Sequence, residues 1–103
     1  MSTPLEQSAN RLTLTARIAE LSEPRRTPAG LPALSLQLEH ESMQEEAGQQ
    51  RTARATVKAV ALGAMAERLQ QQALGTAWCF NGFLMSPRGG RQLVFHIQEF
   101  HPV

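Results

Sequence analysis

Several residue types are scarce in this chain of 103 residues. It contains one cysteine, Cys79, so neither an internal disulfide nor a thiolate metal site can form within it. It has no Asp and no Tyr, and aromatic residues make up only 5% of it. We therefore expect a core of Leu, Val and Ala. We expect Cys79 to be an inert member of that core, since free cysteine usually behaves as a small hydrophobe.

Long apolar runs are also missing. None approaches the roughly 20 residues that a membrane-spanning helix needs, and the opening MSTPLEQSANR has no apolar signal core. These absences predict a cytoplasmic protein without a membrane partner. We expect residues 1–9 to form a flexible leader and residues 10–103 to form a single domain.

Alternation of apolar and polar residues predicts five half-buried strands. Their ranges are 11–18, 33–39, 54–62, 76–85 and 93–100, and the last strand is expected to bury Leu93, Phe95 and Ile97 together. Two glycines bracket a predicted helix over residues 63–75, whose Ala, Glu, Leu and Gln favour helix. Residues 22–32 and 86–92 are rich in Pro or Gly and predict loops, and Gly82 inside a strand predicts a bulge or bend.

The order of these elements predicts a mainly β fold. Three strands, a short helix and two further strands match the OB-fold, a five-stranded antiparallel Greek-key barrel that often binds single strands. Closure into a barrel is favoured because a flat sheet of five such strands would leave open edges. The chief alternative, an SH3-like barrel, lacks a helix between its third and fourth strands.

The basic residues gather in three stretches, although the net charge is only +1. Nine of the ten are Arg, whose planar fork of donors suits phosphate. In an OB-fold, the loops after the first and fourth strands frame a groove beside the third strand, so the three stretches would converge on one surface. The predicted DNA-binding residues are Arg25, Arg26, Arg51, Arg54, Lys58, Arg88 and Arg91.

The segment LEHESMQEEAGQQR, residues 38–51, gathers four glutamates and a histidine. A metal or acid–base site would draw on such groups. The spacing is poor for either, because the side chain of His40 points away from those of Glu39 and Glu41 in a strand, and no HExxH or DxDxDG motif is present. We interpret the segment as a solvated strand end and loop, with no catalytic residue, metal or cofactor. It is also a candidate partner-binding surface through Glu39, Glu41, Glu45 and Glu46.

The run GLPALSLQLEHESMQEEAGQQR resembles the signature of the primosomal replication protein N family, small bacterial relatives of single-stranded DNA-binding proteins. NRLTL near the start, GF in the fourth strand and VFH in the fifth fit as well, so the resemblance covers residues 10–101. It implies a homodimeric OB-fold protein without catalytic activity. Such a protein would bind single-stranded DNA and the primosomal helicase during replication restart, and would help to recruit the helicase-loading protein.

The resemblance also implies roles for individual positions. The family's DNA-contacting basic residues fall on Arg25 and Arg51 and on the loop that contains Arg88 and Arg91. Two aromatic platforms of the family are replaced, one by Gln49 and one by Arg54. Because base stacking contributes about 1–3 kcal/mol per base, a second interpretation is a protein-interaction adaptor that binds DNA weakly. A carboxylate–histidine metal enzyme is a more distant alternative.

Overall fold

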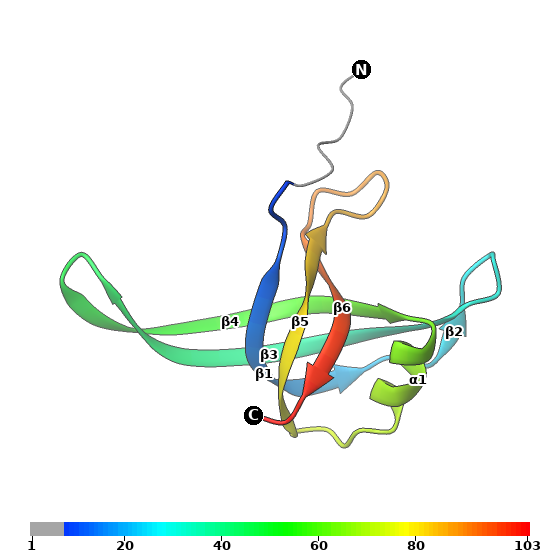
Figure 1. Ribbon diagram of the computed structural model, residues 1–103, viewed down its shortest axis with the longest axis horizontal. Helices are drawn as coiled ribbons and strands as arrows, with labels where there is room; N and C mark the ends of the chain where they lie inside the picture. Colours follow the sequence, from blue (N-terminus) through cyan, green and yellow to red (C-terminus); the bar gives the residue numbers. More distant parts are fainter. Residues whose placement is uncertain (1–7) are drawn as a thin grey trace.

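The computed structural model describes residues 8–103, so most of the predicted leader, 1–9, lies outside the described residues. Within them, no helix is long and apolar enough to cross a membrane. The elements, drawn in Figure 1, are β1 (Leu12–Leu21), β2 (Arg25–Arg26), β3 (Pro32–Glu46), β4 (Gln49–Leu62), α1 (Ala64–Gln70), β5 (Ala77–Met85) and β6 (Val94–His101).

Five long strands close into a barrel. The sheet runs β1-β5-β6-β4-β3-β2, and β1 closes it by pairing with β5 over Leu12–Arg17 and with β3 over Arg17–Leu21. With α1 between β4 and β5, this arrangement confirms the predicted OB-fold. One pairing is parallel, a short contact in which Ala59 and Val60 of β4 lie beside Phe95 and His96 of β6. The short β2, inside the segment predicted as a loop, pairs with the start of β3.

The predicted inner faces of the strands form the core. The fully buried large side chains are Ile18, Leu34, Leu38, Leu69, Phe80 and Phe95. Leu69 comes from α1, which packs its apolar stripe over one end of the barrel. The helix ends at Gln70, short of the predicted residue 75, because the chain must turn to enter β5 beside β1. Backbone bonds from Gly75 N to Ile18 O (2.7 Å) and from Ile18 N to Thr76 O (3.0 Å) hold that entry.

Two residues predicted for the core lie elsewhere. Leu93 precedes β6, which begins at Val94, and is 63% exposed. Cys79 is half-buried, because alternation along β5 turns it away from the face that buries Phe80. Both predictions were wrong, for different reasons: Leu93 has the parity of the buried residues but lies before the strand begins, whereas Cys79 lies on the face of β5 opposite to that of Phe80.

The prediction of a strand end and loop over residues 38–51 is wrong. β3 and β4 continue through it as one regular hairpin, with pairs from His40 opposite Ala55 to Glu46 opposite Gln49. The turn is only Ala47 and Gly48, both at positive φ (52° and 78°), the conformation that a tight two-residue hairpin turn requires. This part of the hairpin, residues 39–56, which we call the arm, projects well beyond the barrel (Figure 1, left).

Gly82 marks the predicted bulge in β5, where the pairing with β6 shifts register between Asn81 and Gly82. The backbone of β6 passes so close that a Cβ on this glycine would lie 1.8 Å from the carbonyl oxygen of His96 and 2.8 Å from the Phe95 ring. No rotation of a side chain can relieve a clash with a backbone carbonyl. The β5–β6 contact therefore depends on the missing side chain.

We expect Gly82→Ala to destabilise the fold by about 3 kcal/mol or more, because the backbones of β5 and β6 must separate. Urea denaturation followed by circular dichroism measures this. Gly89→Ala is the matched control. Gly89, unlike Gly82, has positive φ (76°), but it has open space around it, so that change should cost only about 1–2 kcal/mol of backbone strain. Equal losses in the two variants would contradict the close approach.

Candidate nucleic-acid interface

A row of side chains crosses the outer face of the barrel from β2 to β5. The Arg25 Nη1 donates to Ser35 Oγ at 2.9 Å, and Ser35 lies opposite Val60. Val60 neighbours His96 in the parallel contact, and the His96 ring stacks on Phe83 with centroids 5.0 Å apart and planes 12° apart. Five strands thus place one arginine, one small polar residue and three flat or apolar groups on a continuous surface.

This row borders a hollow on the same face. Its lining residues are Arg25, Ser35, Lys58, Ala59, Val60, Met85, Pro87, Val94 and His96. Two of them are cations from separate strands, because alternation along β4 points Lys58 outward beside Val60. Most of the remaining lining is apolar, and Met85 is 49% exposed. The hollow therefore combines positive charge with exposed apolar surface.

A second depression continues the first along β4. It is lined by Gln37, Thr56, Lys58, Gln92 and Leu93, so Lys58 belongs to both. The loop 86–93 borders both as well, through Pro87 in the first and Gln92 and Leu93 in the second. We call the two depressions together the groove. It occupies the place that an OB-fold uses for its ligand, between the loops that follow the first and fourth long strands.

His96 is the one ionisable ring in the groove. Partial burial lowers the pKa of His96 below its ordinary value, because desolvation disfavours the charged form. At neutral pH the ring is therefore mostly uncharged, and the positive charge of the groove comes from Arg25 and Lys58. A neutral flat ring beside apolar side chains is a surface on which another flat ring can lie.

The other predicted loop cations differ in their position relative to this groove. Arg26 faces away from it, donating to the carbonyl of Gly30 at 2.8 Å and lining a depression with Glu67 of α1. Arg88 and Arg91 are exposed in the loop 86–93, between the residues of that loop that line the groove. Of the four predicted loop cations, Arg25, Arg88 and Arg91 are therefore at or beside the groove, and Arg26 is not.

The arm arginines form a separate set. Arg54 shares the outer face of β4 with Lys58, but its Nε donates to Glu41 at 3.2 Å. Arg51 lies on the opposite face of the arm and is paired with Glu46. The side chains of both pairs are more than 60% exposed, so each pair contributes only about 0–1 kcal/mol and can open. The seven predicted cations thus do not line one continuous surface.

The predicted acidic residues divide between the two faces of the arm. Glu39, Glu41 and Glu45 alternate along the outer face of β3, and Glu46 lies on the other face. At the base of the arm, Arg17 of β1 lies opposite Glu39. Positive and negative side chains therefore alternate across this region. Within residues 8–103, no group of three or more His, Cys, Asp or Glu could hold a metal ion.

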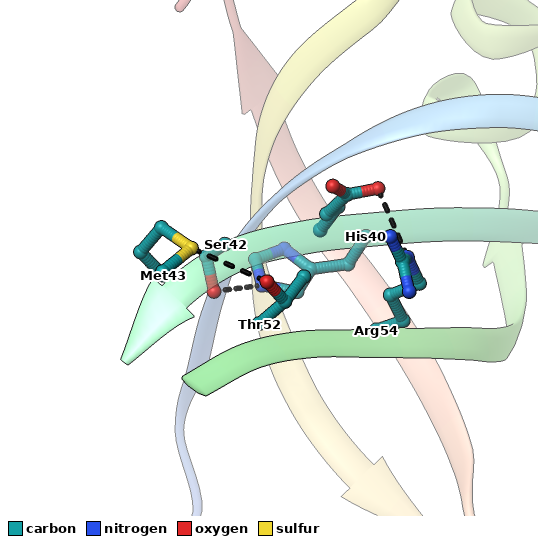
Figure 2. A network of polar contacts seen from close by, with 6 residues as sticks. His40, Ser42, Met43, Thr52 and Arg54 are labelled. Atoms are coloured by element: carbon teal, nitrogen blue, oxygen red, sulfur yellow. Dashed lines mark hydrogen bonds and ion pairs between the residues drawn. The ribbon is translucent and has the colours of Figure 1, made fainter. Parts of the chain in front are cut away.

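His40 joins the arm to β1 through one ring nitrogen, and its other ring nitrogen contacts Ser42 (Figure 2). Its Nδ1 lies 2.6 Å from the carbonyl oxygen of Thr15, so Nδ1 is the donor. Its Nε2 lies 2.7 Å from Ser42 Oγ, which also accepts from Gln44 Nε2 at 2.9 Å. On the other face of the arm, Thr52 Oγ1 contacts Met43 Sδ at 3.3 Å. This histidine thus has a structural set of partners at the point where the arm leaves the barrel.

Sequence reasoning missed the apolar part of the groove. Leu93 was assigned to the core, and Met85 and Val94 were not singled out. The available signal was position: Met85 and Val94 are opposite each other at the ends of β5 and β6, where the strands leave the barrel and apolar residues become exposed. The pairing of Arg54 with Glu41, thirteen residues away in sequence, also required the hairpin register.

Comparisons with known proteins agree with this geometry. The profile of a family described as "Another single-strand binding protein family" matches residues 10–99. Replication restart protein PriB of Bordetella pertussis is 46% identical over 91 residues, covering 87% of this chain and 85% of that protein. The Nitrosomonas europaea protein of the same name is 34% identical over 91 residues, covering 87% of this chain and 84% of its own.

Solved structures give the same result. PriB from Ralstonia solanacearum has a TM-score of 0.85 at 34% identity, covering 92% of this chain and 98% of its own. The wild-type single-stranded DNA binding protein from Thermus aquaticus has a TM-score of 0.71 at 22% identity, covering 92% of this chain and 50% of its own, which shows the shared fold. The family predicted from the LEHESMQEEAG block is confirmed. The chain belongs to the single-strand binding protein family and, within it, to the replication restart proteins PriB.

Proposed function

We propose that this protein binds single-stranded DNA in the groove, as an accessory protein of the replication-restart primosome. The observation that carries the proposal is the meeting of Arg25 and Lys58 at one hollow between the two loops. Arg88 and Arg91 add positive charge along the loop 86–93. A flexible single strand can follow a curved groove and bring successive phosphates to such cations, with little base preference.

The protein also bridges DNA and protein partners in this proposal. The partners are the primosomal helicase and the helicase-loading protein, and the arm, with Glu39, Glu41, Glu45 and Glu46, is the candidate surface for them. Support comes from the arm's position, since it projects from the barrel. We propose that the protein has no catalytic activity and acts in the cytoplasm as a homodimer.

The open edge of β1 is the surface we assign to the homodimer. Residues Leu12–Ala16 pair with β5 along one edge, and within residues 8–103 no strand pairs with their other edge. Only the carbonyl of Thr15 has a partner there, His40. An exposed strand edge with free N–H and C=O groups is a template for a second strand, and two copies of β1 can pair with each other antiparallel.

A protein-interaction adaptor that binds DNA weakly is the second candidate. The observation that favours it is the pairing of Arg51 with Glu46 and of Arg54 with Glu41, which reduces the positive charge of the arm. Nearby carboxylates also repel phosphates. In this alternative the arm binds the helicase, and DNA contributes little.

We expect Arg25→Ala/Lys58→Ala to lower the affinity for a labelled oligo-dT of about 30 nucleotides by tenfold or more. The slope of log K against log salt should become shallower by about 1.4, since each phosphate contact contributes about 0.7. Fluorescence anisotropy at several salt concentrations measures both quantities. A duplex of equal length tests the preference for single strands.

Two further variants place the binding site. Arg51→Ala/Arg54→Ala should cost less than the groove variant, because these cations are paired with glutamates on the arm. Arg68→Gln removes a positive charge on α1, near Phe100 and outside the groove, and should have little effect. A larger loss from the arm variant than from the groove variant would move the binding site onto the arm.

The homodimer proposal predicts a sedimenting mass of twice the 11.3 kDa of one chain at micromolar concentration. On dilution to monomer, hydrogen–deuterium exchange should speed up in the peptide that covers residues 12–16. A monomer at all concentrations would overturn the dimer. Faster exchange confined to another segment would place the interface there instead.

The two candidate functions separate in a binding experiment with the purified primosomal helicase. We expect Glu41→Gln/Glu45→Gln to weaken helicase binding at least fivefold in biolayer interferometry while DNA binding is kept or improved, because negative charge is removed near the arm arginines. Strong helicase binding by a wild-type protein that binds no oligonucleotide would instead support the adaptor.

A further inference from the structure

The hollow has a composition that phosphate binding alone does not explain. A site for a phosphate chain needs cations, and Arg25 and Lys58 supply them. The rest of the lining is mostly apolar: Val60, Met85, Pro87 and Val94, together with the backbone strip at Ala59. Cations at the border of an apolar hollow match a ligand that carries negative charge next to a flat, weakly polar ring.

The side of the hollow formed by β5 and β6 is built from two cross-strand pairs. Phe83 lies opposite His96, with the rings stacked, and Met85 lies opposite Val94. Phe83 covers one face of the His96 ring, and His96 itself borders the hollow. Its lowered pKa keeps this ring largely neutral at pH 7, so it offers a flat surface without added charge. The stack on Phe83 also holds the ring in one orientation.

We propose that this hollow receives one unstacked nucleobase of the bound single strand, with its flanking phosphates on Arg25 and Lys58. The inference rests on the proposed single-stranded DNA binding and adds the place where a base, and not only the backbone, is held. The contact is apolar on the Met85–Val94 side and flat on the His96 side.

The apolar lining of the hollow favours a base of a single strand over a base pair inside a duplex. In a duplex the flat faces of the bases are covered by their neighbours, and the apolar side chains of the hollow would have nothing to cover them. In a single strand each base can turn out and lay one face against a protein surface. The Ser35 hydroxyl, which accepts from Arg25, is the one small polar group in the lining and can meet the polar edge of a base.

An abasic oligomer separates the base from the backbone. We would measure the affinity of the full chain for a labelled oligo-dT of about 15 nucleotides and for an equally long tetrahydrofuran abasic oligomer, which keeps every phosphate. For the wild type we expect the oligo-dT to bind about tenfold more tightly, within the range that one base contact supplies. In Met85→Ser/Val94→Thr this preference should fall about fivefold, with the abasic affinity changed less than twofold.

Leu74→Ser is the matched control, since Leu74 is 63% exposed in the segment after α1, outside the groove. It should leave both affinities and their ratio unchanged. Thermal unfolding of each variant confirms that it is folded. If Met85→Ser/Val94→Thr fails to fold, Met85→Ser alone, at an exposed position, makes the same test with a smaller expected fall of about twofold.

The outcomes distinguish this inference from the function on which it rests. If both oligomers bind the wild type equally, or the preference survives in the groove variant, the base site is overturned and single-strand binding through phosphates stands. If neither oligomer binds, both proposals fail together. A preference that falls as much in Leu74→Ser as in the groove variant would also overturn the site.

Discussion

An unbroken antiparallel ladder joins β3 to β4, from Ala33 opposite Leu62 to Glu46 opposite Gln49. Its inner half is a wall of the barrel and its outer half is the arm, so one register governs both. Because side chains alternate strictly along a strand, a slip of one residue would exchange every inward and outward group. The same register that buries Leu36 and Ala59 therefore turns Lys58 to the groove and sets Arg54 beside Glu41. Charge placement in this protein follows from core packing.

The fold was predictable wherever burial leaves a periodic trace. Ile18, Leu34 and Leu38 alternate with polar neighbours because one face of each strand meets the core and the other meets water. In most of the arm neither face is buried, so residues 40–53 carry no such trace, and the sequence predicts a strand end and loop over 38–51 in place of the hairpin. Only the turn had a local signal, in Gly48, and the positive φ of Ala47 was not foreseeable from its side chain. Leu93 failed differently, because alternation continues past the residue at which β6 begins.

The candidate site was predictable as a list of residue types more than as a surface. Arg25 and Lys58 were expected to lie near each other because an OB-fold brings their segments together, and they do. The opposite facing of Arg51, the turn of Arg26 toward α1 and the ion pairs of the arm depend on cross-strand neighbours. Glu46 and Arg51 are only five residues apart, yet the pair forms because a two-residue turn folds one against the other. The apolar lining depends on where β5 ends and β6 begins, and single-sequence patterns locate strand ends poorly.

The arm also has a consequence for the order in which the chain acquires its structure. β3 and β4 are consecutive, so their hairpin needs only local contacts, whereas the barrel closes only when β5 and β6, made later, return to β1 and β4. Contacts between distant segments form slowly because loop closure precedes them. During synthesis the finished hairpin therefore waits with Leu34, Leu36 and Leu38 uncovered. The glutamates and arginines of the arm, attached to the same two strands, make that waiting hairpin a poor template for other strands. We therefore expect the segment that projects from the mature barrel to protect the immature one against aggregation.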